Sequence, residues 1–156
     1  MKYRNYEIGL SVEIDNALID RIRETGLAHY PNEFGGLLVG EYSEDKQTVS
    51  ITDTILPLNY KSSRISFDRG IDGLKDKLLD FYSANPSRIY VGEWHTHPNA
   101  APIPSWTDML AVRQIVASKS VNISNPIMLI LGLTLTETKL AFYVYLNNKL
   151  YEYETV

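Results

Sequence analysis

The segment Gly92-Glu93-Trp94-His95-Thr96-His97-Pro98 overlaps the end of a predicted strand, residues 88–93, and carries two histidines two positions apart. Strand side chains alternate between the two faces of a sheet, so both imidazoles are expected on one face. Trp94 and Thr96 are then expected on the opposite face, where they pack. The paired imidazoles are a candidate metal site, although two histidines at a strand end also arise by chance.

Asp108 is the candidate third ligand, because it begins a predicted helix over residues 105–118 after a proline-rich loop that can turn back to the histidines. Two neutral imidazoles and one carboxylate are a recurrent ligand set for catalytic zinc, which keeps one position open for water. Glu93 is the rival, since it lies two residues before His95 and shares its face. Asp108 is preferred because Glu93 is expected within the core and can pair with a base.

Glu33 is the candidate general acid/base for a zinc-activated water. It precedes the glycine pair Gly35-Gly36, which allows close backbone approach just before a buried strand. Burial there would raise the pKa of a carboxyl group, which suits a group that takes up a proton and later delivers it to a leaving amine. The alternative is that Glu33 is an ordinary loop carboxylate beside a turn.

Ser105 has two compatible interpretations. The pattern Ser105-x-x-Asp108 predicts a helix N-cap, in which Ser105 accepts the first unpaired amide. The same hydroxyl is a candidate partner for the oxyanion that forms when an amide is attacked. Trp106, in the loop beside the site, is a weaker candidate contact for a substrate tail.

The rest of the chain predicts a mixture of strands and helices. Strands are expected over residues 6–13, 35–41, 49–56, 65–67, 126–135, 140–146 and 150–153. Helices are expected after Asp15, ending near Gly26 or His29, and over residues 74–82 and 105–118. Hairpins outnumber strand–helix alternations, which favours an α+β fold. We therefore predict a single domain over residues 1–156, with a mixed, mostly antiparallel β-sheet flanked by about three helices.

Composition narrows the classes of function. The chain contains 0 cysteines, which excludes disulfides, thiolate nucleophiles and cysteine-ligated zinc. Its formal charge of −4 arises from intermixed acids and bases, so no nucleic-acid partner is expected. No apolar run approaches the roughly 20 residues of a membrane span, and the start lacks a secretory signal. A soluble, cytoplasmic protein is the expectation.

The spacing of Glu33, His95, His97, Ser105 and Asp108 resembles the JAMM signature of the JAB/MPN metalloprotease family at every signature position. The Glu-x-x-Gly-x-Leu-x-Gly context of Glu33 is also typical of this family. The resemblance implies one zinc held by the two histidines and Asp108, with Glu33 as acid/base and Ser105 as oxyanion partner. It also implies the family's curved mixed sheet, which is similar to that of cytidine deaminases.

The resemblance further implies an isopeptidase or peptidase that acts at the C-terminus of a ubiquitin-like protein. The compact chain is similar to prokaryotic JAB proteins, which include deconjugating isopeptidases encoded beside E1-like and E2-like enzymes in CBASS-type anti-phage operons. Peptidases that process sulfur-carrier proteins and metal-free scaffold modules of the same fold are the alternatives. A DNA-repair role would need a basic surface, which the pI of about 5.3 does not indicate. Residues 59–68 are a candidate strand for pairing with a substrate tail.

Overall fold

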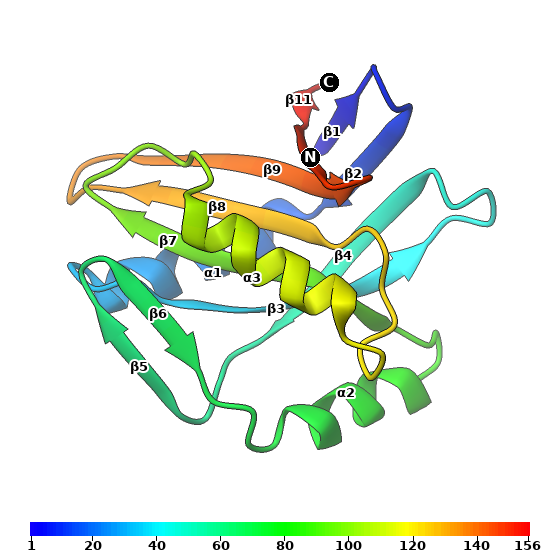
Figure 1. The fold of residues 1–156 in the computed structure, drawn as a ribbon, viewed down its shortest axis with the longest axis horizontal. Helices are drawn as coiled ribbons and strands as arrows, with labels where there is room; N and C mark the ends of the chain where they lie inside the picture. The colour runs from blue at the N-terminus through cyan, green and yellow to red at the C-terminus, as the bar shows by residue number, and fades with distance from the viewer.

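The computed structural model describes residues 1–156 and is built around one large, curved sheet (Figure 1). The strands of this sheet are β1 (Lys2–Asn5), β2 (Leu10–Ile14), β3 (Gly35–Tyr42), β4 (Thr48–Ile55), β7 (Ile89–Pro98), β8 (Ile127–Leu133), β9 (Thr138–Leu146), β10 (Lys149–Glu152) and β11 (Glu154–Thr155). They form a nine-stranded sheet in the order β10-β9-β8-β7-β3-β4-β2-β1-β11. Two further strands, β5 (Tyr60–Ser63) and β6 (Ser66–Arg69), form a separate antiparallel hairpin.

Most neighbouring strands are antiparallel, but β2 pairs with β4, and β7 with β8, in parallel. Three helices accompany the sheet: α1 (Asn16–His29), α2 (Leu74–Ser83) and α3 (Trp106–Ala117). Helix α1 covers one face, while α2 and α3 lie against the other (Figure 1). The predicted α+β fold, with a curved, mostly antiparallel sheet and three helices, is confirmed. None of these helices combines the length and the apolar character needed to cross a membrane.

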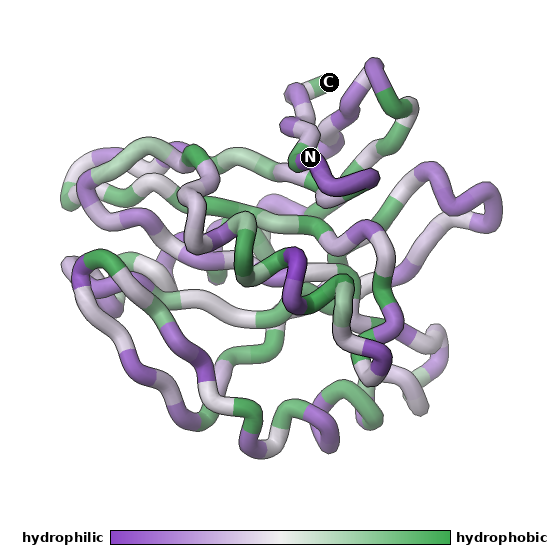
Figure 2. The backbone as a smooth tube through the Cα atoms, viewed as in Figure 1, coloured by the Kyte–Doolittle hydropathy of each residue, from purple (hydrophilic) through white to green (hydrophobic).

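Strand β8 explains why the core has two layers. All of its residues are buried. Leu129, Leu131 and Leu133 belong to the cluster that includes α1, whereas Met128 and Ile130 belong to the cluster beneath α3. A central strand covered on both faces therefore reads as a continuous apolar run. In contrast to this apolar strand, the turn between β3 and β4 is hydrophilic (Figure 2).

Two predicted strands differ from the structure by more than a residue or two at one end. The strand expected over residues 6–13 is wrong in its first half, because the chain turns there and joins β1 to β2. Asn5 stabilises this turn by accepting hydrogen bonds from the amides of Ile8 and Gly9, and Gly9 adopts a positive φ of 71°. The strand expected over residues 88–93 continues as β7 to Pro98. The two histidines are therefore inside the sheet rather than in the loop that follows it.

Candidate active site

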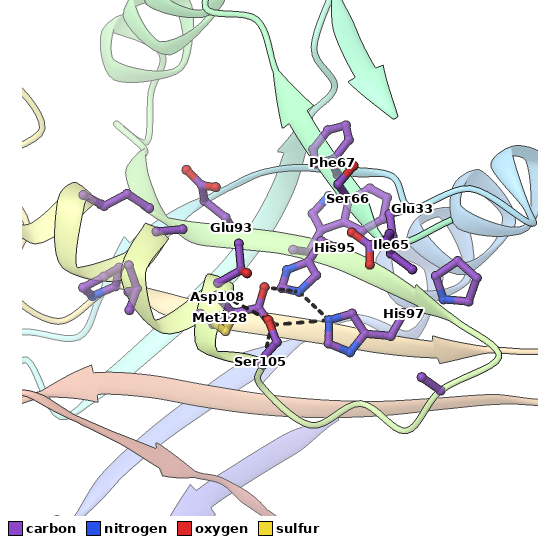
Figure 3. Close-up of a pocket in the computed structure, with 18 of the residues that line it drawn as sticks. Glu33, Ile65, Ser66, Phe67, Glu93, His95, His97, Ser105, Asp108 and Met128 are labelled. Carbon is purple, nitrogen blue, oxygen red and sulfur yellow. Dashed lines mark hydrogen bonds and ion pairs between the residues drawn. The ribbon is translucent and has the colours of Figure 1, made fainter. Parts of the chain in front are cut away.

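His95 and His97 project from the same face of β7 into a pocket of about 440 Å³ (Figure 3). Their Nε2 atoms are 3.0 Å apart. Trp94 and Thr96 point to the opposite face and are 1% and 0% exposed. The predicted alternation is confirmed, and the two imidazoles converge because the strand stays regular through both residues.

Helix α3 brings Asp108 to the histidines. Its Oδ1 atom lies 3.1 Å from Nε2 of His95, and its Oδ2 atom lies 3.4 Å from Nε2 of His97. Ser105 caps the helix in a capping box: its Oγ accepts the Asp108 amide at 3.2 Å, and its own amide donates to Asp108 Oδ2 at 2.6 Å. The predicted cap is confirmed. It holds the Asp108 carboxylate in place through the first turn of the helix.

The three side chains form a group that fits a metal ion. Their ligand atoms all lie within 4.8 Å of one another. The two Nε2 atoms are 3.0 Å apart, and they lie 3.1 Å from Oδ1 and 3.4 Å from Oδ2 of Asp108, respectively. These separations are comparable with the edge of about 3.3 Å in a tetrahedron with bonds of about 2.05 Å, as around zinc. Two nitrogens and one oxygen leave a fourth position open to the pocket. The donor set and its spacing suit zinc bound at a catalytic site.

A loop after β7 orients the second imidazole. Nδ1 of His97 lies 3.3 Å from the Ala101 carbonyl, which accepts a hydrogen bond when the proton is on Nδ1 and leaves Nε2 as the ligand atom. The Tyr143 hydroxyl donates to the Pro102 carbonyl at 2.9 Å and so anchors this loop from β9. Gly132 makes room for it, because a Cβ there would lie 2.5 Å from the Ala100 carbonyl oxygen. These contacts carry no signal in the sequence and were not predicted.

Burial and hydrogen bonding shift the charges of this group in opposite directions. Burial alone would raise the pKa of Asp108, but hydrogen bonds from both histidines, together with the charge of His95 and the Ser105 amide, hold that pKa well below 3.8. Burial alone would lower the pKa of His97, but its hydrogen bond to Asp108, the negative charge of that carboxylate and the Ala101 carbonyl together raise that pKa above 6.5. Without a metal, the pair therefore favours an imidazolium beside a carboxylate.

Glu33 lies two residues before the start of β3, and its carboxylate points toward the two histidines (Figure 3). Burial raises the pKa of Glu33 above 4.5, and the nearby His95 and His97 offset only part of that effect. Position 35, two residues after Glu33, requires glycine, because a Cβ at Gly35 would lie 2.3 Å from the carbonyl oxygen of Trp94. Close backbone approach thus places a partly buried carboxyl group beside the candidate metal ligands.

Glu93 lines the same pocket but belongs to a different cluster. Its carboxylate accepts hydrogen bonds from the Arg69 guanidinium and, at 3.3 Å, from the Tyr90 hydroxyl. Tyr90 reaches this face because Val91 is an unpaired bulge residue in the ladder between β3 and β7. Burial raises the pKa of Tyr90, so its hydroxyl stays neutral and donates. Glu93 is therefore paired with the basic residue Arg69. This is the pairing with a base that the sequence predicts, and it favours Asp108 over Glu93 as the metal ligand.

Trp106 lies at the first position of α3, outside the residues that line the pocket. Its side chain is 70% exposed, and the guanidinium of Arg113 is 6.0 Å from its ring. A role in substrate contact stays a prediction.

Most of this chain matches a known protein family. The family model described as prokaryotic homologs of the JAB domain matches residues 15–147. The chain belongs to this family. A relative from Enterobacter hormaechei subsp. hoffmannii, named CD-NTase/cGAS isopeptidase, is 35% identical over 123 residues, which cover 78% of this chain and 67% of the relative. A shorter match, 46% identical over 43 residues, covers 27% of this chain and 26% of a Sinorhizobium fredii protein named a probable metalloprotease.

The fold of this JAB chain also has a counterpart among solved structures. The solution structure of a protein from Desulfitobacterium hafniense superimposes with a TM-score of 0.66 and covers 93% of this chain and 91% of its own. The two chains are 16% identical, so this likeness concerns the fold alone.

Proposed function

We propose that this JAB-family chain is a zinc-dependent isopeptidase that cleaves an amide bond at the C-terminal tail of a conjugated protein. The observation that carries the proposal is the convergence of His95, His97 and Asp108 on one point of a pocket that also contains the Glu33 carboxylate. The relative named CD-NTase/cGAS isopeptidase supports conjugates of a CD-NTase, made by E1-like and E2-like enzymes, as the first substrates to test.

The chain's own residues divide the work of hydrolysis. Zinc, when bound, supplies a Lewis acid that activates water and polarises the scissile carbonyl. Glu33 takes the proton from the attacking water and delivers it to the leaving amine, a task suited to a carboxyl group with a raised pKa. The Ser105 hydroxyl, whose oxygen already accepts the Asp108 amide, donates its proton toward the carbonyl oxygen as negative charge develops there.

The shape of the pocket supports a peptide tail as substrate. One wall is the turn and second strand of the β5–β6 hairpin, residues 64–67, and the other is the face of α3 that carries Ala111, Val112 and Ile115. A groove between a hairpin and a helix fits an extended chain, whose main chain can pair with strand β6. A tail paired in this way would run across the candidate metal ligands.

The first test is zinc content and deconjugation measured together. Wild-type protein purified without chelator is expected to hold about one zinc per chain, and His97→Ala about none, because a catalytic zinc site has three protein ligands. Wild type should release a CD-NTase from its isolated conjugate, while Glu33→Ala keeps its zinc and releases about 100-fold less in the same time. No zinc in either protein, even after reconstitution, would support a metal-free scaffold instead. Zinc without release would redirect the search to sulfur-carrier tails.

A further inference from the structure

The backbone of Glu33 is held by the β5–β6 hairpin on both of its polar groups. Its amide donates to the Ser63 carbonyl at 2.7 Å. Its carbonyl accepts the hydroxyl proton of Ser62 at 2.5 Å. Ser62 and Ser63 are neighbours on β5. Ser62 is 29 residues from Glu33 in the sequence. The residue that carries the proposed general base is therefore attached to the hairpin like a short additional strand.

The next residue is attached to the opposite side. The Phe34 amide donates to Oγ1 of Thr96 at 3.0 Å, and the Thr96 amide donates to the Phe34 carbonyl at 2.8 Å. Thr96 lies between His95 and His97 on β7. Phe34 thus connects Glu33 to the strand of the histidines, while Glu33 itself connects to the hairpin. The peptide between Glu33 and Phe34 spans the space between these two elements.

The hairpin is itself fixed to the core, so it can serve as a support. The Phe34 ring lies 4.9 Å from the ring of Tyr60 and 5.4 Å from that of Phe67. At the open end of the hairpin, where Arg69 is the cross-strand partner of Tyr60, the guanidinium of Arg69 pairs with Glu93 on β7. Aromatic packing and an ion pair therefore hold both strands of the hairpin against the elements that build the site.

We propose that Ser62 is a positioning residue for Glu33. Its hydroxyl sets the plane of the peptide that follows Glu33, and this plane directs the Cα–Cβ bond and hence the carboxylate toward the histidines. The inference rests on the proposed function, in which Glu33 is the general acid/base. Because residues 64–67 of the same hairpin line the groove, substrate binding and placement of the base depend on one element.

The test compares Ser62→Thr with Ser62→Val, which have nearly the same shape and differ in one hydroxyl. With conjugated CD-NTase as substrate, Ser62→Val is expected to lower kcat about ten-fold with KM and zinc content unchanged, since small misplacements of catalytic groups cost one to two orders of magnitude. Ser62→Thr should stay within about two-fold of wild type. Ser87→Ala is the matched control, because Ser87 also donates to a backbone carbonyl, that of Tyr82 at 2.7 Å, but outside the pocket.

Amide hydrogen exchange supplies a readout that does not depend on turnover. Exchange at Glu33 should be at least about ten-fold faster in Ser62→Val than in Ser62→Thr, because loss of the hydroxyl loosens the adjacent bond to Ser63. Equal exchange and equal kcat in the two variants would overturn the proposal. If wild type cleaves no conjugate, the proposed function fails, and the exchange rates still decide whether Ser62 holds Glu33. A parallel rise in KM or loss of zinc would assign Ser62 to substrate binding or folding instead.

Discussion

At the scale of single residues, the site combines groups whose protonation is shifted in ways that suit hydrolysis. Glu33 has a raised pKa because it is buried, while the pKa of Asp108 is lowered by hydrogen bonds from two imidazoles. The pKa values of two carboxyl groups in one pocket are therefore shifted in opposite directions. Environments of this kind separate a carboxyl group that exchanges protons from one that stays charged.

The raised pKa of Glu33 predicts the acid limb of the pH–rate profile. A general base works only when deprotonated, so kcat/KM should fall as pH falls through a value above the ordinary 4.5. Glu33→Gln, which cannot take up the proton, should lower kcat by about 100-fold or more at every pH on the plateau. The measurement is single-turnover release of a conjugate between pH 5 and 9. An acid limb that is unchanged in the residual activity of Glu33→Gln would assign it to another group.

At the scale of elements, the loop between β7 and α3 carries the orientation of His97. The Tyr143 hydroxyl on β9 anchors this loop, and Gly132 on β8 lets it pack closely against the sheet because glycine has no Cβ. Gly132 is also the cross-strand partner of His97 in the ladder between β7 and β8. The loop conveys the effect of Tyr143 and Gly132 through the Ala101 carbonyl.

Tyr143→Phe is therefore expected to weaken zinc binding by about ten-fold, at the low end of the range for outer contacts of metal ligands. Competition with a fluorescent chelator measures the affinity directly. Tyr145→Phe is the matched control. Tyr145 lies two residues after Tyr143 on the same strand, and its hydroxyl donates to the Asn148 side chain at 2.9 Å. Equal zinc affinity in the two variants would show that the loop does not depend on this anchor.

At the scale of the whole molecule, a bound metal links two layers of structure, since the histidines lie on β7 and Asp108 on α3. A ligand that binds only the folded state stabilises it by mass action. Zinc at about 100 times its dissociation constant should add roughly 2.7 kcal/mol to the free energy of unfolding. Thermal unfolding with and without chelator measures this shift. His97→Ala should show almost no difference between the two conditions.

In the metal-free protein, the pairing of His97 with Asp108 should stabilise the fold more at low pH than at high pH. His97 has a raised pKa, so its pairing with Asp108 contributes stability below pH 6.5 that is lost as pH rises through the raised pKa. Asp108 has a lowered pKa, so its contribution is present above pH 3.8 and is lost only in stronger acid. Metal-free wild type should therefore exceed His97→Ala in melting temperature by more at pH 5.5 than at pH 9. A difference that grows toward pH 9 would contradict this pairing.

Local rules account for much of the fold and for most of the candidate site. Alternation along β7 predicts that His95 and His97 share a face, and the capping pattern predicts where Asp108 sits at the start of α3. The apolar run over residues 126–135 predicts a buried strand. Each of these inferences depends on residues a few positions apart, where backbone geometry alone fixes the relation between side chains. The sequence by itself therefore determined the kinds of element and the chemistry of the proposed ligand set.

Only the tertiary structure decided which distant segments support that chemistry. Ser62 lies 29 residues from Glu33, and Tyr143 lies 41 residues from Pro102, so no periodicity connects them. The same holds for Arg69, which occupies Glu93 and leaves Asp108 as the nearest carboxylate to the histidines. These contacts form where curved strands and a hairpin happen to meet in space. Their positions follow from the packing of the whole sheet, which short-range patterns in the chain do not encode.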